Sequence, residues 1–196
     1  VKAEFTVGQR SGWHRYTFPE SGPKNLIINL GFAINWDKPY QTALELVNDT
    51  LVTGMRLSTG WAKDQHVYFA VRLSTPVVSY ETGKPGGEAC TVGVLSFADK
   101  QVMAKVGISS VSAENALANL DASPGGWDFE STAKAASDAW EKELSKIRIE
   151  TDDQDQKKET PADQDTGVDL RGRWIHEGFE TMSGNGIKGR GPLICV

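Results

Sequence analysis

The sequence contains little cysteine. Its 196 residues include two cysteines, Cys90 and Cys195, which lie far apart in the chain. Their separation is not that of a metal-ligand or redox motif, so neither a cysteine-based metal centre nor thiol redox chemistry is predicted. A disulfide between the two is not expected, although nothing in the sequence forbids it.

The sequence also lacks long apolar runs and any excess of positive charge. No segment approaches the roughly 20 apolar residues that a membrane-spanning helix needs, so we expect no membrane span. The chain has 21 Lys and Arg residues against 26 Asp and Glu residues, a net charge of -5, and no basic cluster. Because phosphate contacts require clustered Lys and Arg, we expect no binding to nucleic acid.

Several signatures of catalysis are missing as well. The chain has no Gly-x-Ser-x-Gly motif and no P-loop, and His14, His66 and His176 are scattered. The densest acidic run, "TDDQDQ" at 151–156, is hydrophilic, whereas a general acid needs a protected pocket that raises its pKa. Its spacing does not match a calcium-binding loop. The first residues have neither an initiating Met nor a signal-peptide core, and we expect the chain to begin inside a larger protein.

What the sequence does contain is a series of short strands. Alternating apolar residues predict half-buried strands at 2–8, 66–73 and 101–109. Their residues on one shared face, which we expect to be the core, are Ala3, Phe5 and Val7, then Val67, Phe69, Val71 and Leu73, then Val102, Ala104, Val106 and Ile108. Further apolar runs are separated by turn sequences such as "SGPKN" and "TGKPGG". This pattern predicts an antiparallel β-sandwich, with no strand–helix alternation that would indicate a parallel sheet.

Two helices are predicted after residue 109. Ser112 can cap a short helix, and Asp128 can cap a longer one. The apolar residues of the short helix are Ala113, Ala116, Leu117 and Leu120, and those of the longer helix are Phe129, Ala133, Ala136, Trp140, Leu144 and Ile147. The longer stripe must pack on something. It fits either the protein's own sheet or a following domain, and periodicity does not distinguish the two.

Two stretches combine aromatic and polar residues. In "WHRYTFPE" (13–20), alternation places His14 on the same face as Tyr16 and Phe18, which we interpret as a core-facing strand with a structural histidine. The alternative is a sugar site, where a polar group lies beside an aromatic platform. In "TGWAKDQHVYF" (59–69), we predict substrate contacts from Trp61, Lys63 and Asp64, because binding residues concentrate in loops on rigid sheets. The alternative is that Trp61 covers a sheet edge beside a solvated Lys63–Asp64 turn.

Several blocks, in order, resemble the N-terminal domain of glycoside hydrolase family 92. They include "RSGWHRYTFPES", "NLIINLG", "TGWAKDQHVYFAVRLSTP" and "AWEKELSKIRIE", and the resemblance extends from about residue 2 to residue 158. The family comprises calcium-dependent exo-acting α-mannosidases of the inverting type. The resemblance implies a β-sandwich of the supersandwich type, joined through a helix at 128–147 to an (α/α)6 catalytic barrel, with the active site between them.

The resemblance also predicts how the chain is divided. Residues 1–110 would form an incomplete N-terminal β-sandwich, 111–149 a helical linker toward a missing catalytic barrel, and 150–196 a polar, flexible tail. The fold class is therefore all-β with appended helices, a sandwich followed by a linker helix. Residues 159–196 fall outside the resemblance, which fits a truncated or shifted reading frame, a divergent linker or a fusion. We favour the first of these explanations.

The function implied is that of an exo-α-mannosidase, with this chain supporting the catalytic barrel and part of the substrate cleft. Mannose-containing glycans and the barrel would be its partners, and a secreted or periplasmic location is expected. In the family, the acid and base carboxylates and most calcium ligands belong to the barrel, so the resemblance assigns no catalytic or metal-binding residue to this sequence. Calcium is therefore expected in the full-length enzyme and not on this chain, and the chain alone is predicted to be inactive.

Two alternatives to the enzyme fragment remain open at this stage. One is a stand-alone carbohydrate-binding sandwich without hydrolase activity. The other is a structural or interaction domain whose helical stripe binds a protein partner.

Overall fold

The computed structural model describes residues 1–146 together with two short strands at 174–177 and 193–194. The strands are β1 (Lys2–Val7), β2 (Gly12–Thr17), β3 (Asn25–Asn29), β4 (Lys38–Asn48), β5 (Leu51–Thr59), β6 (Gln65–Leu73), β7 (Val77–Gly83), β8 (Val92–Phe97), β9 (Gln101–Ser109), β10 (Trp174–Glu177) and β11 (Leu193–Ile194). A short 3-10 helix, η1 (Gly87–Ala89), precedes β8, and two α-helices, α1 (Ala113–Asp121) and α2 (Phe129–Leu144), follow β9.

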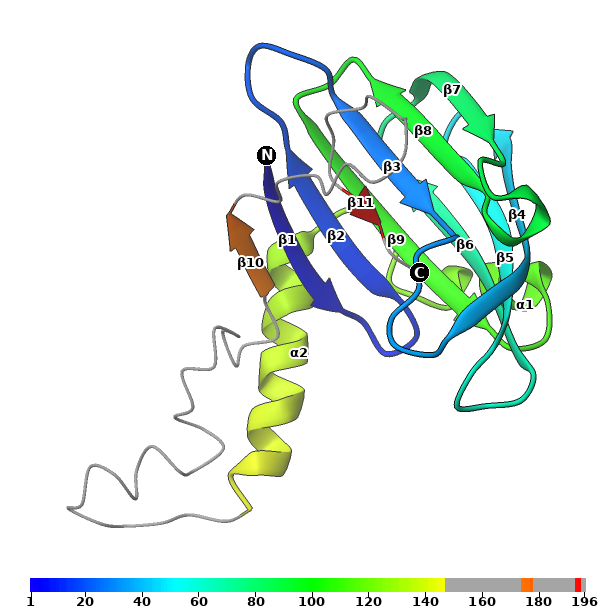
Figure 1. The fold of residues 1–196 in the computed structure, drawn as a ribbon. Coiled ribbons are helices and arrows are strands. Elements are labelled where there is room, and N and C mark those ends of the chain that lie inside the picture. The colour runs from blue at the N-terminus through cyan, green and yellow to red at the C-terminus, as the bar shows by residue number, and fades with distance from the viewer. Residues whose placement is uncertain (147–173, 178–192, 195–196) are drawn as a thin grey trace.

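The strands form two sheets that pack face to face (Figure 1). The larger sheet has the order β10-β1-β2-β9-β6-β5-β4 and the smaller has the order β11-β3-β8-β7. Neighbouring strands are antiparallel, except that β11 pairs in parallel with β3. The predicted fold class, an antiparallel β-sandwich with appended helices, is confirmed.

The core between the sheets contains most of the predicted inward residues of β6 and β9. Phe69, Val71, Val102 and Ala104 are fully buried there, together with aromatic residues of β2. Of the residues predicted to face the core in these strands, Phe5, Val67 and Val106 are half-buried, and two are exposed: Val7 at 49% and Ile108 at 58%. Val7 is the last residue of β1 and Ile108 is next to the last residue of β9, and both lie beyond the core cluster. The alternation of apolar residues therefore extends further along these strands than their burial does.

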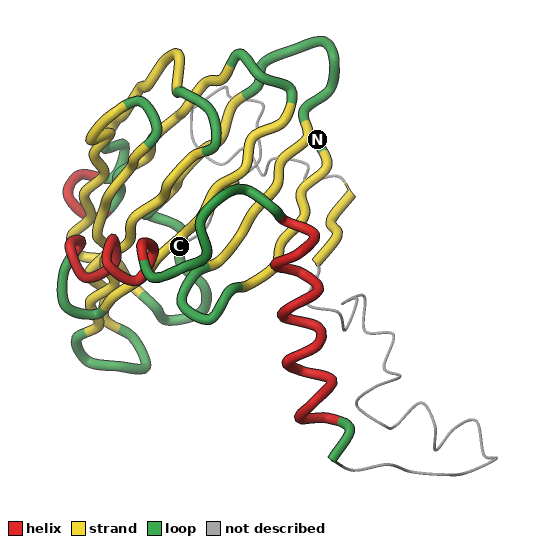
Figure 2. Tube along the Cα trace, turned by 180° about the vertical axis from the view of Figure 1, so that it is seen from behind, coloured by secondary structure: helices red, strands yellow, loops and turns green. Residues whose placement is uncertain are grey.

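The outer face of the larger sheet is also covered, because both helices lie on it (Figure 2). The Oγ of Ser112 accepts a hydrogen bond from the Asn115 backbone N–H, which confirms the predicted cap of α1. Ala116 and Leu120 of α1 bury Ala70 of β6. The approach is so close that a Cβ at Gly107 would lie 2.3 Å from the Ala116 carbonyl oxygen. A glycine is therefore needed where α1 crosses β9.

Helix α2 rests on the sheet only along its first turns. Asp128 accepts a hydrogen bond from the Ser131 backbone N–H at 2.9 Å, as predicted for its cap. Phe129 and Ala133 are buried, in a cluster that includes Trp13, but Trp140 on the same stripe is 56% exposed. Figure 2 shows α2 continuing past the ends of the strands. The stripe thus packs on the protein's own sheet in its first half and leaves the sheet in its second; Ile147 lies outside the described residues.

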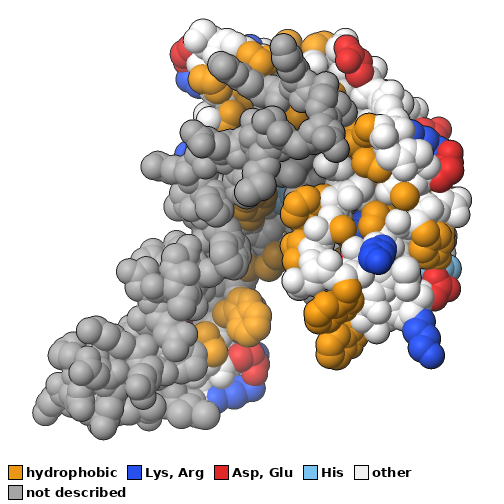
Figure 3. Space-filling view, viewed as in Figure 1, with side chains coloured by type: hydrophobic (Ala, Val, Ile, Leu, Met, Phe, Trp, Pro, Cys, Tyr) orange, Lys and Arg blue, Asp and Glu red, His pale blue; other side chains and the backbone are white. Residues whose placement is uncertain are grey.

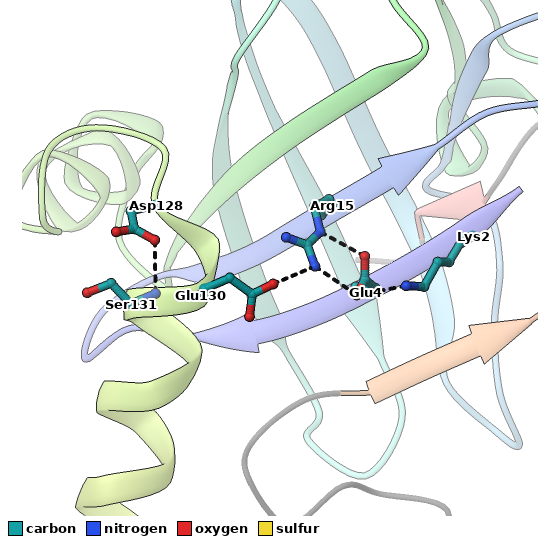
Figure 4. A network of polar contacts seen from close by, with 6 residues as sticks. All are labelled: Lys2, Glu4, Arg15, Asp128, Glu130 and Ser131. Carbon is teal, nitrogen blue, oxygen red and sulfur yellow. Dashed lines mark hydrogen bonds and ion pairs between the residues drawn. The ribbon is translucent and has the colours of Figure 1, made fainter.

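Ionic and hydrogen bonds fasten the start of α2 to β1 and β2 (Figure 4). The Arg15 guanidinium donates to both carboxylate oxygens of Glu4, and its Nη2 also donates to Glu130 of α2 at 3.0 Å. Lys2 adds an ion pair with Glu4, and the guanidinium lies 4.3 Å from the centre of the Phe129 ring. The Arg15 guanidinium lowers the pKa of Glu4, which keeps this buried carboxylate ionised.

A buried lysine fixes the connection between the two helices. The ammonium of Lys105 lies 4.1 Å from the ring centre of Trp13 and 4.9 Å from that of Trp127, and it donates to the Pro124 carbonyl at 2.8 Å. Burial lowers the pKa of Lys105. A cation between two aromatic faces holds the 122–127 segment against the sheet.

The sequence-based division into domains stays a prediction. The expected flexible tail, 150–196, lies outside the described residues apart from β10 and β11, and so does Cys195. In the described part of the chain, neither helix is long and apolar enough to cross a membrane.

Candidate functional site

The "WHRYTFPE" stretch is a core strand, as interpreted from its alternation. Tyr16 and Phe18 are 1% exposed, and the ring of His14 packs edge-on against Phe5 and contacts the Tyr16 hydroxyl at 2.9 Å. Burial lowers the pKa of His14 to about 4, so its imidazole is neutral at physiological pH. The opposite face is covered too, since Trp13 is 1% exposed beneath α2. His14 is a structural side chain.

The most exposed large apolar side chain is in the second predicted stretch. Trp61, in the loop between β5 and β6, is 90% exposed, and Trp36, in the loop between β3 and β4, is 59% exposed. Their rings stack with centroids 6.1 Å apart and planes inclined by 26°. We call Trp36 and Trp61 the aromatic pair. Both loops lie at the same end of the sandwich (Figure 1), where apolar side chains gather at the surface (Figure 3).

Three polar residues form a second group at this end of the sheet. The Tyr40 hydroxyl donates to Asp64 Oδ1 at 2.7 Å, and His66 Nε2 lies 3.1 Å from the same oxygen. We call Tyr40, Asp64 and His66 the polar cluster. The hydrogen bond from Tyr40 lowers the pKa of Asp64, and the same bond raises the pKa of Tyr40. Asp64 is therefore an exposed carboxylate that stays ionised.

A buried arginine fastens the loop that contains Trp36. Arg56 of β5 is 7% exposed. Its Nε donates to the Leu30 carbonyl and its Nη2 to the Phe32 carbonyl, both at 3.1 Å, and Nη2 also donates to Asp37. Arg56 lowers the pKa of the Asp37 carboxyl, so the pair stays charged at neutral pH. A side chain on a core strand thus fixes the backbone on both sides of Trp36.

The two loops also touch each other directly. Gly60, one residue before Trp61, approaches Asp37, one residue after Trp36, so closely that a Cβ at Gly60 would lie 3.0 Å from the Asp37 Cα. This contact brings the two tryptophans side by side.

The predicted substrate residues are only partly brought together. Trp61 joins Trp36, and Asp64 joins Tyr40 and His66, whereas Lys63 is exposed and makes no hydrogen bond or ion pair among the described residues. Sequence reasoning missed Trp36 and Tyr40, because "NWDKP" reads as an ordinary turn. Their proximity to Trp61 and Asp64 depends on the register of β4 with β5 and of β5 with β6.

The described acidic residues do not cluster. Within residues 1–146, no three or more His, Cys, Asp or Glu side chains lie together in a way that could hold a metal ion. Calcium requires six to eight oxygen ligands. The carboxylates of Asp64 and Asp37 instead accept hydrogen bonds, from Tyr40 and Arg56 respectively.

Comparison with known proteins places this geometry in context. The model of the glycosyl hydrolase family 92 N-terminal domain matches residues 1–109, and the model of that family's catalytic domain matches residues 115–160. The second match includes α2. No curated protein matches the chain.

Solved structures give the same result. A family 92 α-mannosidase from Bacteroides thetaiotaomicron is 28% identical over 76% of this chain, with a TM-score of 0.69, and has also been solved in complex with mannoimidazole. An inverting family 92 mannosidase from the same bacterium is 20% identical over 76% of the chain, with a TM-score of 0.62, and shows the shared fold. The chain spans 22% of the length of the first of these proteins and 21% of the second.

Proposed function

Because this chain belongs to glycosyl hydrolase family 92, we propose that it forms the N-terminal sandwich of an α-mannosidase that removes terminal α-mannose from glycans. The observation that supports this most is the order of the two family matches, the N-terminal domain at 1–109 followed by the catalytic domain at 115–160. The mannosidase relative and its mannoimidazole complex support mannose as the sugar.

We propose that the reaction inverts the anomeric configuration. In an inverting glycosidase, one carboxylic acid protonates the leaving oxygen, and a carboxylate about 6.5 to 9.5 Å away activates a water. Neither Asp64 nor Glu4 is suited to act as the general acid. Asp64 has a lowered pKa and is exposed, and Glu4 is buried against Arg15. This supports the proposal that the chain alone is inactive and that a catalytic barrel supplies both groups.

Calcium is proposed for the whole enzyme and not for this part of it. In support of this proposal, no group of three or more His, Cys, Asp or Glu side chains gathers among the described residues in a way that could hold a metal ion. Within the sandwich, we propose that Trp61, Lys63 and Asp64 contact the glycan at the edge of the substrate cleft. A secreted or periplasmic location is part of the same proposal, since glycans of this kind would be met there.

The test is to measure release of mannose from an α-linked mannobiose by two proteins. One is the 196-residue chain, and the other is the longest protein that its gene encodes. We expect no release by the chain, and release by the longer protein that stops with a calcium chelator and returns with added calcium. Mannose release by the chain would refute its inactivity, and a longer protein inactive on every α-mannoside would refute the function.

A stand-alone carbohydrate-binding sandwich is the second candidate, and the exposure of the aromatic pair favours it. It predicts sugar binding by a protein that never hydrolyses the sugar, whatever its length. An interaction domain is the third candidate, and the exposure of Trp140 favours that one. It predicts self-association or a protein partner that is lost on substitution of Trp140.

A further inference from the structure

We propose that the aromatic pair and the polar cluster form a preformed binding site for one pyranose unit, with Arg56 as its positioning residue. The ring would stack on the open face of Trp61, and the Asp64 carboxylate would accept hydrogen bonds from its hydroxyls. The assignment of the sugar as an α-mannoside rests on the proposed function. The existence of a pyranose site is argued independently, from the described residues alone.

The first argument concerns the two indole rings. Trp61 and Trp36 are 90% and 59% exposed, and together they place two large apolar rings at the surface, the kind of exposed apolar patch that marks ligand-binding sites. The Trp61 ring stacks on Trp36 with the centroids 6.1 Å apart, and most of its surface stays open to solvent. A flat, open, apolar face suits the C–H face of a pyranose, and the contact with Trp36 restricts the side chain before the sugar arrives.

The second argument concerns hydrogen bonding beside the rings. Within the described residues, the hydrogen bonds of Asp64 all end on Oδ1, and its side chain is 65% exposed. Oδ2 is therefore available as an acceptor, and its charge makes it a strong one. Tyr40 on β4 and His66 on β6, the two strands that flank β5, both contact the carboxylate. One fixed acceptor beside an apolar platform is the usual composition of a sugar site.

The third argument concerns rigidity, which Arg56 supplies. Its guanidinium bonds the backbone carbonyls of Leu30 and Phe32 and the carboxylate of Asp37, and its Nη1 donates to the Ser58 hydroxyl at 3.1 Å. Ser58 lies on β5, which leads into the Trp61 loop, and Asp37 follows Trp36. One buried side chain thus sets the relation between the two loops. A lysine cannot replace it, because an ammonium lacks the planar fork that reaches several acceptors at once.

A sugar fits this surface better than a protein partner does. The centre of a protein interface is depleted in charged groups, and a carboxylate buried there without a partner is penalised. Here an ionised acceptor lies in the same short loop as the exposed ring, three residues from it. Polyols satisfy such a carboxylate with neutral hydroxyls.

The experiment titrates the 196-residue chain with methyl α-mannopyranoside and follows the indole N–H signals by NMR. The chain has six tryptophans, and the signals of Trp36 and Trp61 are assigned by substitution. We expect both signals to shift on titration. W61A should weaken binding by about tenfold or more, and D64N by about threefold or more. The matched control is W140A, because Trp140 is exposed on the far part of α2, and its substitution should leave binding unchanged.

Arg56 needs a readout that separates positioning from folding. Two stacked indoles give an exciton couplet in circular dichroism. W36A and W61A should both remove the same part of the couplet, while the part from Trp13 and Trp127, whose ring centroids are 6.2 Å apart, remains in both. R56K should shrink the couplet and weaken sugar binding, while the cooperative unfolding transition persists. An R56K protein with an intact couplet and unchanged binding would refute the positioning role.

The remaining outcomes also decide the question. If methyl α-glucoside or β-galactoside shifts the two signals and the mannoside does not, the sugar site stands and its assignment to an α-mannoside fails, while the proposed function is decided separately by mannose release from the longer protein. If no pyranoside shifts them, the site proposal is wrong. Loss of self-association in W61A without any sugar response would identify the aromatic pair as a protein contact and would also refute the proposal.

Discussion

Arg15 on β2 donates two hydrogen bonds to the carboxylate of Glu4 on β1, from Nε to Oε2 at 2.7 Å and from Nη2 to Oε1 at 2.8 Å. This geometry is the strong form of an ion pair, because both donors are fixed in one plane. Since Nη2 also reaches Glu130, the same guanidinium connects two strands to the first turn of α2. The pair thus fastens a helix to the face of a sheet.

Substituting this arginine should destabilise the sandwich. In R15M, Glu4, whose side chain is 3% exposed, loses two hydrogen bonds while it stays buried. We expect the free energy of unfolding to fall by about 2 to 4 kcal/mol. The control is K134M, which removes an exposed pair with Asp138 and should cost less than about 0.5 kcal/mol. Urea denaturation measures both, and equal losses would contradict the assignment.

Stability should fall between pH 6.5 and pH 4 because of His14. Its pKa is lowered from 6.5 to about 4 by burial, so the unfolded chain binds a proton in this window and the folded chain does not. The contribution is complete above pH 6.5 and is lost as the pH falls toward 4, by up to about 3 kcal/mol. H14F should flatten the slope of unfolding free energy against pH in this window. An unchanged slope would contradict the burial of the imidazole.

Adding one methyl group at Gly107 should displace α1. The new Cβ would lie 2.3 Å from the Ala116 carbonyl oxygen and 3.0 Å from the Leu120 Cβ, neither of which is a flexible side-chain end. We expect G107A to lower the free energy of unfolding by about 2 kcal/mol or more. G83A is the matched control, because a Cβ there meets no atom within 4 Å, and it should be neutral or slightly stabilising. Thermal unfolding of both variants tests the contact.

The two aromatic residues of the α2 stripe should differ sharply in their energetic effect. Phe129 is 2% exposed and Trp140 is 56% exposed. F129A should cost about 3 kcal/mol or more, because it leaves a cavity beside Trp13, whereas W140A should change the unfolding free energy of the sandwich by less than about 0.5 kcal/mol. Denaturant titration distinguishes them. A large loss in W140A would show that the distal part of α2 packs on the sandwich after all.

Much of the fold follows from local chemistry in the sequence. Ser112 and Asp128 cap the helices as predicted, because a side-chain oxygen next to free backbone N–H groups acts locally. Alternation also identified the inner face of β6. It missed the burial of Glu4 and Lys105 on the outer face, because that burial is supplied by helices located later in the chain. Periodicity within a strand contains no information about a distant cover.

The candidate site was only half predictable for a similar reason. Trp61 and Asp64 stand out as an aromatic and a charged residue in one loop of a sheet protein. Trp36 and Tyr40 do not, because their approach depends on strand register and on the contacts of Arg56 with the preceding loop. Those contacts join residues far apart in sequence, and single-sequence patterns do not report them.

The way α2 is anchored gives the helix the properties of a lever. Its fixed point is the contact of Glu130 with Arg15, and the helix of 16 residues extends about 24 Å from its first residue to its last. A tilt of about 5° at the fixed point therefore moves the far end by about 2 Å. Small rearrangements between β1 and β2 are thus amplified along the helix. The Arg15–Glu130 hydrogen bond at its N-terminal end therefore helps to determine the position of its C-terminal end.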